Sequence, residues 1–272
     1  MHAILAAAVF LALPCAVHAA GPTTTWERPD LEGETVEDAV EWLRAAVELD
    51  ASAVATRRRH ADRAVALLGP GHFASELIAD AVRGDAVQEP ARLAAAYEAL
   101  TFRPRKEGDM PPGFPAFTPV HAVELKQYPQ YRVARADHGE GPDSAFFSLF
   151  GHIQRNSVKM TVPVEMRSAE GDASATMAFL YERPDQGATG TDAEDDRVEV
   201  VDVAPTTVLA TGVRGRRREV GTEAAEARLN AWLAEHPDYA AAGPFRVMGY
   251  NSPFIPPDQQ YFEVQVPVGR VE

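Results

Sequence analysis

The chain has 272 residues, of which 46% are hydrophobic and 24% are charged. This composition is typical of a globular protein and excludes a disordered or fibrous chain, and the length suggests about two domains. The formal net charge of −14 argues against a nucleic-acid partner and against binding to anionic membranes, because phosphate groups repel a strongly acidic protein.

Residues 1–20 are expected to be a signal peptide. Residues 3–13 form an unbroken apolar run that is too short to span a bilayer. Val17 and Ala19 are compact residues before an expected cleavage after Ala19 or Ala20. We therefore expect an exported protein, periplasmic or secreted, with no transmembrane segment in the mature chain. The alternative, an uncleaved anchor, is weaker because the run is about half a spanning length.

The only cysteine, Cys15, lies inside this expected signal peptide. A mature chain without cysteine has no disulfide, no thiol nucleophile and no thiolate metal site.

Residues 35–101 are Ala-rich and are expected to form three or four helices in a small bundle. Val36, Val40, Leu43 and Val47 recur at helical spacing. The basic run at 57–60 could be an anion site, but a solvated helix face is the stronger interpretation. Residues 102–119 hold five prolines and two glycines, which predicts a linker or a strap between this region and the rest.

Residues 120–269 are expected to form an α+β domain with an internal duplication. Val123 and Val198 begin two strand patterns 75 residues apart, and Val133 and Val208 repeat the same offset. Each pair of strands leads into a helix, at 144–154 and 222–235, and then into two more strands, at 158–166 and 175–181 or at 245–250 and 260–266. Two copies of strand-strand-helix-strand-strand predict a pseudo-two-fold axis, with a ligand cleft where the copies meet.

Four passages in this region resemble the SOUL haem-binding protein family. They are VELKQYPQYRVA at 123–134, AFFSLFGHIQRN at 145–156, KMTVPVEM at 159–166 and GYNSPFIPP at 249–257. The resemblance covers about 121–269 and not the helical region. It implies a distorted β-barrel with two helices outside, similar to the ligand-sensing domains of bacterial multidrug-responsive regulators.

The resemblance also implies the function. Members bind haem or other tetrapyrroles through a hydrophobic cleft, share no axial ligand and are not defined by catalysis. We therefore expect an exported, non-catalytic binder of a tetrapyrrole or a similar hydrophobic small molecule, with haem as the candidate cofactor.

Six residues are candidates for ligand contact. Flat aromatic faces suit a planar tetrapyrrole, methionine is a known axial ligand, and a lysine can pair with a propionate. The candidates are Tyr128, Tyr131, Tyr250, Phe254, Met160 and Lys159. Core or turn packing accounts equally well for the aromatic residues, gap filling is the stronger interpretation of Met160, and an exposed strand lysine is the default for Lys159.

Three histidines are weak candidates for iron ligands: His121, His138 and His152. Neutral imidazole is a common iron ligand. Helical spacing, however, places His152 with Ser148 on the face of its helix opposite to Phe146, Leu149, Phe150 and Ile153, and therefore predicts that it faces solvent. The arginines at 214 and 216–218 could meet propionates, although a solvated turn is the stronger interpretation.

Two alternatives belong to other classes. In the first, the domain is packed shut and the helices at 35–101 bind a protein partner. In the second, the domain is a small-molecule hydrolase in which a Glu and a Tyr in the cleft activate a water, and Glu124 and Glu199, which are equivalent in the two copies, are the candidate carboxylates. No common catalytic motif is present, so no catalytic residue is assigned.

Overall fold

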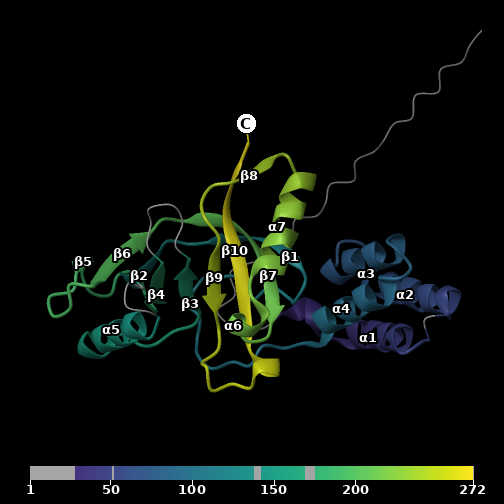
Figure 1. Ribbon diagram of the computed structural model, residues 1–272, viewed down its shortest axis with the longest axis horizontal. Coiled ribbons are helices and arrows are strands. Elements are labelled where there is room, and N and C mark those ends of the chain that lie inside the picture. The colour runs from purple at the N-terminus through teal and green to yellow at the C-terminus, as the bar shows by residue number, and fades with distance from the viewer. Residues whose placement is uncertain (1–27, 51, 138–141, 169–174, 272) are drawn as a thin grey trace, which may run out of the picture.

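The computed structural model describes residues 28–50, 52–137, 142–168 and 175–271 (Figure 1). The expected signal peptide and His138 lie outside this part of the chain. No helix within it is long and apolar enough to cross a membrane.

The N-terminal region contains four α-helices after a short 3-10 turn, η1 (Pro29–Leu31). They are α1 (Glu34–Val47), α2 (Val54–Leu68), α3 (Phe73–Arg83) and α4 (Glu89–Thr101). Gly69 takes a positive φ of 79° between α2 and α3, and His72 Nδ1 caps α3 by accepting from the Ala74 amide at 3.1 Å. Buried alanines and leucines fill the space between the helices.

The basic run on α2 is not wholly solvated, which corrects part of the prediction. Arg57 is fully buried, with its Nη1 3.6 Å from Glu89 Oε1, and Arg58 pairs with the same carboxylate at 2.8 Å. A buried carboxylate on α4 therefore draws Arg57 inward, since a buried charge needs a partner.

The rest of the chain folds around one antiparallel sheet. Its strands are β1 (Val123–Tyr128), β2 (Tyr131–Asp137), β3 (Val164–Arg167), β4 (Thr176–Leu180), β5 (Gly190–Thr191), β6 (Val198–Val203), β7 (Thr206–Arg214), β8 (Tyr239–Ala241), β9 (Arg246–Gly249) and β10 (Tyr261–Arg270). The helices are α5 (Pro142–Arg155), α6 (Arg217–Val220) and α7 (Glu223–Glu235), with a 3-10 turn, η2 (Pro257–Gln259).

The strand order is β1-β7-β10-β9-β3-β4-β2-β6-β5, with β8 beside β10. The described strand pairs do not join the two ends of this order, so the sheet is open where a barrel was expected. We call β1, β7, β10 and β9 the β10 half, and β3, β4, β2 and β6 the β4 half. They meet where β9 pairs with β3.

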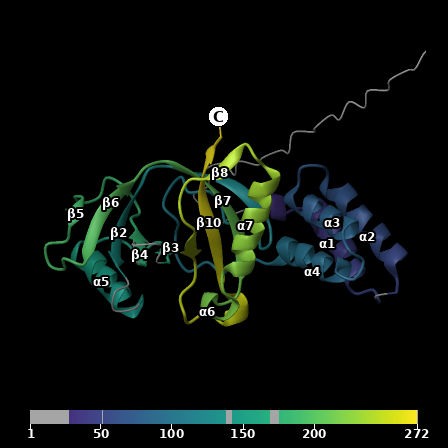
Figure 2. The same cartoon turned by 45° about the horizontal axis from the view of Figure 1, so that its top comes forward.

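The two faces of the sheet are covered differently. On the helix face, α7 packs on the β10 half and α5 packs on the β4 half. The other face is covered by residues 102–120, which we call the strap, and we call this the strap face. Figures 1 and 2 show the helical bundle beside β1 and α7, at the opposite side of the molecule from α5. One apolar cluster runs from the bundle through the strap to the strap face.

Two local predictions were wrong. The strand expected at 158–166 is reduced to β3, and Met160 is 36% exposed, since Pro163 has no amide hydrogen to donate to a ladder. On α5, His152 and Ser148 face the core while Phe150 is exposed. His152 is held toward the core by polar partners outside the helix, although apolar spacing alone predicts that it faces solvent.

Candidate functional site

The strap face of the β10 half is polar, although it is buried. Side chains alternate between the two faces of a strand, so β1 presents Glu124, Lys126 and Tyr128 to the strap, and β10 presents Tyr261, Glu263 and Gln265. Lys126 and Glu263 are both 0% exposed. This polar surface is therefore part of the interior of the protein.

An ion pair lies at the centre of this surface. Lys126 Nζ is 2.7 Å from Glu263 Oε1, and the same oxygen accepts from the Thr118 amide of the strap at 2.8 Å. Burial alone would raise the pKa of Glu263, but the adjacent Lys126 ammonium, with these hydrogen bonds, holds it below the usual value. The carboxylate is therefore ionised and fixes the strap to β10.

The polar network continues toward the β4 half. Gln265 Nε2 donates to the Tyr128 hydroxyl at 2.8 Å, and Arg246 Nε donates to Gln265 Oε1 at 3.0 Å. Arg246 Nη1 then reaches the Tyr131 hydroxyl at 2.8 Å and Glu165 Oε2 at 2.9 Å. Burial and the Glu165 charge raise the pKa of Tyr131 to about 12, so this phenol stays protonated.

The strap lies on this network with its aromatic side chains pointing inward. Phe114 packs edge-on against Tyr128 and Tyr131, with ring centroids 4.9 and 5.2 Å apart, and Phe117 packs against Tyr261 at 5.8 Å. Gly212 of β7 permits this approach, because a Cβ there would lie 2.3 Å from the Thr118 carbonyl oxygen. The space expected for a ligand is therefore filled by the chain itself.

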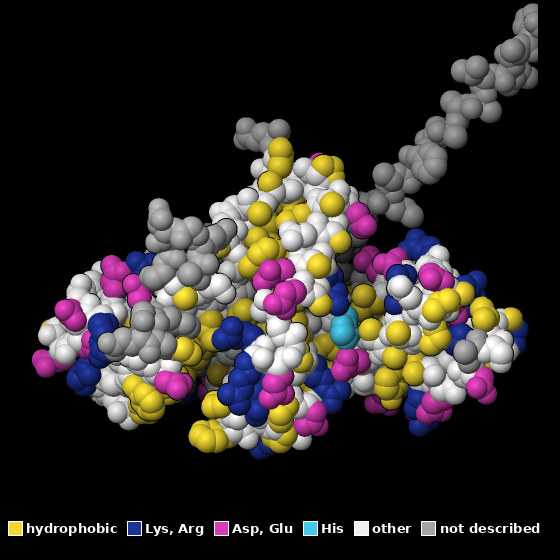
Figure 3. Space-filling view, in the orientation of Figure 1, with side chains coloured by type: hydrophobic (Ala, Val, Ile, Leu, Met, Phe, Trp, Pro, Cys, Tyr) yellow, Lys and Arg dark blue, Asp and Glu magenta, His cyan; other side chains and the backbone are white. Residues whose placement is uncertain are grey.

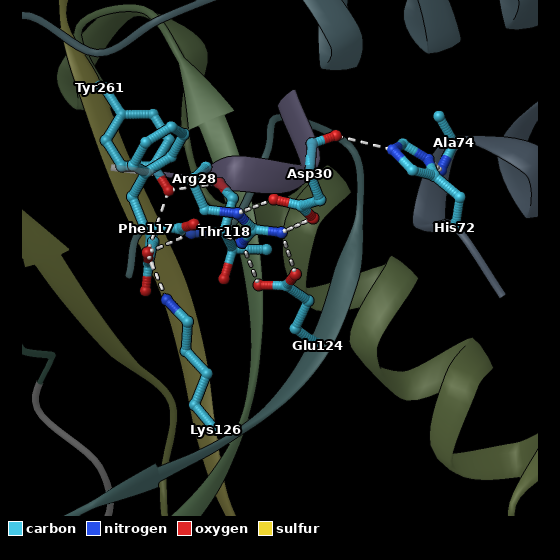
Figure 4. A network of polar contacts seen from close by, with 10 residues as sticks. Arg28, Asp30, His72, Ala74, Phe117, Thr118, Glu124, Lys126 and Tyr261 are labelled. Carbon is cyan, nitrogen blue, oxygen red and sulfur yellow. Dashed lines mark hydrogen bonds and ion pairs between the residues drawn. The ribbon is translucent and has the colours of Figure 1, made fainter. Parts of the chain in front are cut away.

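Arg28 joins the start of the described chain to the strap and to β1 (Figure 4). Its guanidinium forms two hydrogen bonds with Glu124, at 2.8 and 3.0 Å, and donates to the Phe117 carbonyl at 2.7 Å. It also pairs with Asp30 at 2.6 Å. One buried guanidinium thus holds three segments together.

A cavity lies beside the strap. It has a volume of about 300 Å³ and is lined by Pro111, Phe114, Tyr131 and Tyr181, among others. That volume is at the lower end of the range for small-molecule pockets. In addition, Arg246 Nη2 and Thr118 Oγ1 are buried without a hydrogen-bond partner in the described part of the chain. The contact between the strap and the sheet therefore leaves one polar atom on each side without a partner.

Comparison with known families decides what this domain is. The profile described as "SOUL heme-binding protein" matches residues 114–267, more than half of the chain. The chain belongs to the SOUL heme-binding protein family. The match begins at Phe114 and so includes the second part of the strap, whereas the sequence motifs suggested a start at about residue 121.

Other comparisons add little to the SOUL assignment. No curated protein matches significantly. Similar solved structures include a hydrolase from Listeria innocua (14% identity, TM-score 0.42, covering 56% of this chain and 94% of that one). They also include the C-terminal domain of EcmrR (13%, 0.39, 55% and 98%) and SAV2435 bound to tetraphenylphosphonium (10%, 0.34, 54% and 93%). These scores are too low to carry an argument about function.

The SOUL domain brings three of the six predicted contact residues to the strap face. Tyr128, Tyr131 and Tyr250 are buried there. Phe254 is 91% exposed on the loop after β9, so it is not part of this surface. Lys159 lies outside it too, pairing with Asp109 at 2.9 Å, and Met160 next to it is partly exposed.

The two candidate histidines that the structure describes, His121 and His152, are engaged elsewhere. His152 Nε2 is 2.7 Å from the Tyr181 hydroxyl, and its Nδ1 is bound to Asp192. His121 Nε2 is 2.8 Å from Glu98 Oε2. No group of three or more potential metal ligands occurs among the described residues. Neither His121 nor His152 therefore lies on the strap face with a free ring nitrogen.

The two carboxylates behind the hydrolase alternative are not brought together. Glu124 is buried against Arg28, whereas Glu199 is half-exposed and pairs with Arg135 at 2.6 Å. They stand on β1 and β6, which lie near opposite ends of the strand order. Each candidate carboxylate is thus held by an arginine, which removes the main support for the hydrolase alternative.

Sequence reasoning missed Lys126, Glu263, Gln265, Arg246 and Glu165. The available signal was alternation: Glu124-Lys126-Tyr128 and Tyr261-Glu263-Gln265 are two polar series on alternate residues. Such a series is normally the solvent face of a strand. Only the strap, which covers it, makes this face an interior one.

Proposed function

We propose that this protein is an exported, non-catalytic binder of a tetrapyrrole or a ligand of similar flat, apolar shape. The observation that supports the proposal is the position of the Phe114 ring. An aromatic ring from a segment without regular structure lies against Tyr128 and Tyr131, next to the 300 Å³ cavity. The strap face thus already holds a flat apolar group, supplied by its own chain.

In this proposal the ligand takes the place of Phe114 on the strap face. Residues 102–119 form no helix and no strand, so they can move without unfolding a regular element. The two unpartnered polar atoms, Arg246 Nη2 and Thr118 Oγ1, each destabilise the closed state by about 1–3 kcal/mol. A ligand with an acceptor group would satisfy Arg246.

The ring, and not an iron atom, is expected to provide the binding energy. Both ring nitrogens of His152 are engaged, and His121 is bound to Glu98. Metal-free protoporphyrin should therefore bind the mature chain, residues 20–272, within about threefold of haemin, since no ligation energy separates them. Soret absorbance and tryptophan quenching measure both. A preference for haemin above a hundredfold would show that iron ligation dominates.

A disulfide that locks the strap tests where the ligand binds. A Cβ at Gly108 would lie 3.3 Å from a methyl group of Val162, and the expected mature chain has no other cysteine. Oxidised Gly108→Cys/Val162→Cys should bind protoporphyrin at least about tenfold more weakly than the reduced form, because the open state is rarer. Equal affinities would place the ligand away from the strap face.

The opposite change loosens the strap. Gly212→Ala should push Thr118 away from β7 and strengthen binding by about tenfold or more. Gly269→Ala is the matched control, because a Cβ at Gly269 meets nothing within 4 Å. If Gly212→Ala fails to fold, the oxidised and reduced forms of the disulfide variant still decide the question.

A second candidate function follows if the strap stays closed over the sheet. The network of Arg28, Glu263 and Lys126 fixes the strap, and Trp42 on α1 is 40% exposed. The SOUL domain would then be a closed scaffold and the bundle a protein-binding surface. Absence of tetrapyrrole binding in wild type, reduced disulfide variant and Gly212→Ala would favour this candidate.

Export and domain division belong to the same proposal. We propose cleavage after Ala19 or Ala20, a helical region at 35–101 and a duplicated SOUL domain at 120–269. The strand order supports the duplication: exchanging β1, β7, β10 and β9 with β6, β2, β4 and β3 reproduces it from the other end. N-terminal sequencing of protein from the periplasm or medium tests the cleavage, and an intact Met1 there would contradict it.

A further inference from the structure

A second hollow lies between the helical bundle and the sheet, and it shares no lining residue with the cavity at the strap. It has a volume of about 870 Å³. One wall is the half-exposed face of α4 that carries Ala91, Ala94 and Ala95. The opposite wall includes His121 and Arg214. Figure 3 shows hydrophobic, basic, acidic and histidine side chains meeting where these two parts of the molecule join.

The groove is elongated and mainly apolar. From Ala91 to Phe102 it follows α4 and its end over 11 steps of the chain, which is about 16 Å at the helical rise. Alanine side chains leave room along this length, and Phe102 lines the groove just after α4 ends. An extended apolar chain matches this shape better than a compact or globular group does.

Positive charge gathers at the Phe102 end. The Arg214 guanidinium lies 5.0 Å from the centre of the Phe102 ring, and its Nη1 pairs with Glu98 at 2.8 Å. Arg103 donates only to backbone carbonyls, those of Leu31, Leu100 and Phe102. Arg105 is exposed and its side chain has no partner in the described chain.

The acidic groups of the groove do not cancel this charge. Glu98 is shared by Arg214 and His121, and the only other carboxylate in the lining is that of Asp258. Within the described chain, Arg103 and Arg105 therefore form no hydrogen bond or ion pair with a carboxylate, although Glu32 and Asp30 act electrostatically on Arg103. This occurs in a chain whose formal net charge is −14. Charge-assisted hydrogen bonds to a carboxylate are the interaction that such groups favour.

The backbone at His121 supports a binding role for this place. His121 has a positive φ of 66°, which is uncommon for a residue with a side chain and recurs at functional sites. Its ring contacts Glu98 on α4, and Arg228 Nη2 lies 3.4 Å from its Nδ1. One wall of the groove is thus fixed to the other.

We propose that this groove binds a long-chain carboxylic acid. The apolar chain lies along the alanine face of α4, and the carboxylate meets Arg103 and Arg105. This site is separate from the strap face, so the inference does not depend on the proposed function. The groove is lined by residues of both the helical region and the SOUL domain, so the inference gives the helical region a part in ligand binding.

Isothermal titration of the mature chain with dodecanoate below its micelle concentration tests the inference. We expect saturation at one equivalent, binding at least about tenfold weaker for dodecan-1-ol, and none for dodecyltrimethylammonium. Arg105→Glu and Ala95→Glu should each weaken dodecanoate binding by about tenfold or more. Arg63→Glu and Ala66→Glu, exposed positions on α2, are the matched controls and should leave it unchanged.

Three results would overturn the inference: no saturable dodecanoate binding, equal affinity for the alcohol, or an equal loss in the α2 controls. The strap-locking disulfide separates the two sites. Its oxidised form should keep the dodecanoate affinity of the reduced form, and a shared loss would move the acid to the strap face. Dodecanoate binding without protoporphyrin binding would refute the proposed function and leave this inference standing.

Discussion

The two halves of the strap face share a strand order but not a chemistry. In the β10 half, the interior positions of β1 are Glu124, Lys126 and Tyr128. In the β4 half, the residues of β6 at the same 75-residue offset are Glu199, Val201 and Val203. The strap-facing side of β1 is thus part of a buried ionic network, whereas two of the three equivalent positions of β6 are valines. A fold can keep its topology while the interior of one half is specialised to hold a strap.

Breaking the central ion pair should have the largest effect. Lys126→Met leaves Glu263 ionised and buried without a counter-ion, which should lower the free energy of unfolding by about 3–5 kcal/mol. Urea denaturation measures this. Adding Glu263→Gln, which keeps an acceptor for the Thr118 amide without the charge, should restore part of the loss. A change below about 1 kcal/mol in the single variant would mean that water reaches the pair.

Glu124→Gln should have a smaller effect and lower the free energy of unfolding by about 2–3 kcal/mol. Arg28 loses one charged hydrogen-bond acceptor but keeps Asp30 and the Phe117 carbonyl. Urea denaturation at pH 7 is the measurement. Protease cleavage within the strap should also become faster, since Arg28 holds both segments. Unchanged stability and unchanged cleavage would mean that Arg28 does not hold the strap closed.

A pH dependence is expected where the bundle meets the SOUL domain. The hydrogen bond from His121, opposed by burial and reinforced by Arg214, lowers the pKa of Glu98 to about 2. A carboxyl with a depressed folded pKa stabilises the protein above its unfolded value and loses that contribution as the pH falls through the folded one. The stability advantage of wild type over Glu98→Gln should therefore shrink between pH 4.5 and pH 2, as followed by circular dichroism. A constant difference would contradict it.

The smallest effect is expected at Glu199. Its pair with Arg135 is half-exposed, and exposed pairs contribute about 0–1 kcal/mol. Glu199→Gln should therefore leave the urea midpoint almost unchanged. Comparison with Glu124→Gln then measures how far two residues at equivalent offsets differ in role. Equal losses would mean that the halves are alike.

The elements of the fold follow from periodicity, and the family follows from motifs. Apolar spacing predicted helices where α1, α3 and α4 occur, and the motif KMTVPVEM indicated the SOUL domain. The boundaries failed where tertiary contacts decide them: β3 covers only part of 158–166, and His152 turns inward because Asp192 and Tyr181 bind it.

The site was less predictable than the fold. Tyr128, Tyr131 and Tyr250 were expected around a cleft because aromatic residues lie near the motifs, and the structure buries them beneath the strap; their contact with a ligand stays a prediction. Lys126 and Glu263 were not, because alternation shows which residues share a face and not whether that face is covered. The covering segment is rich in proline and lacks periodicity, so nothing in its pattern reveals where it lies.

The attachment of the strap at both ends sets a threshold for any ligand of the face beneath it. A tethered group meets its own binding surface at an effective concentration on the order of millimolar. A free ligand present at about one micromolar must therefore have an intrinsic affinity about a thousandfold higher than that of the strap to occupy half of the molecules. The strap would act as a filter that rejects weakly bound aromatic compounds and admits only those whose contacts exceed its own.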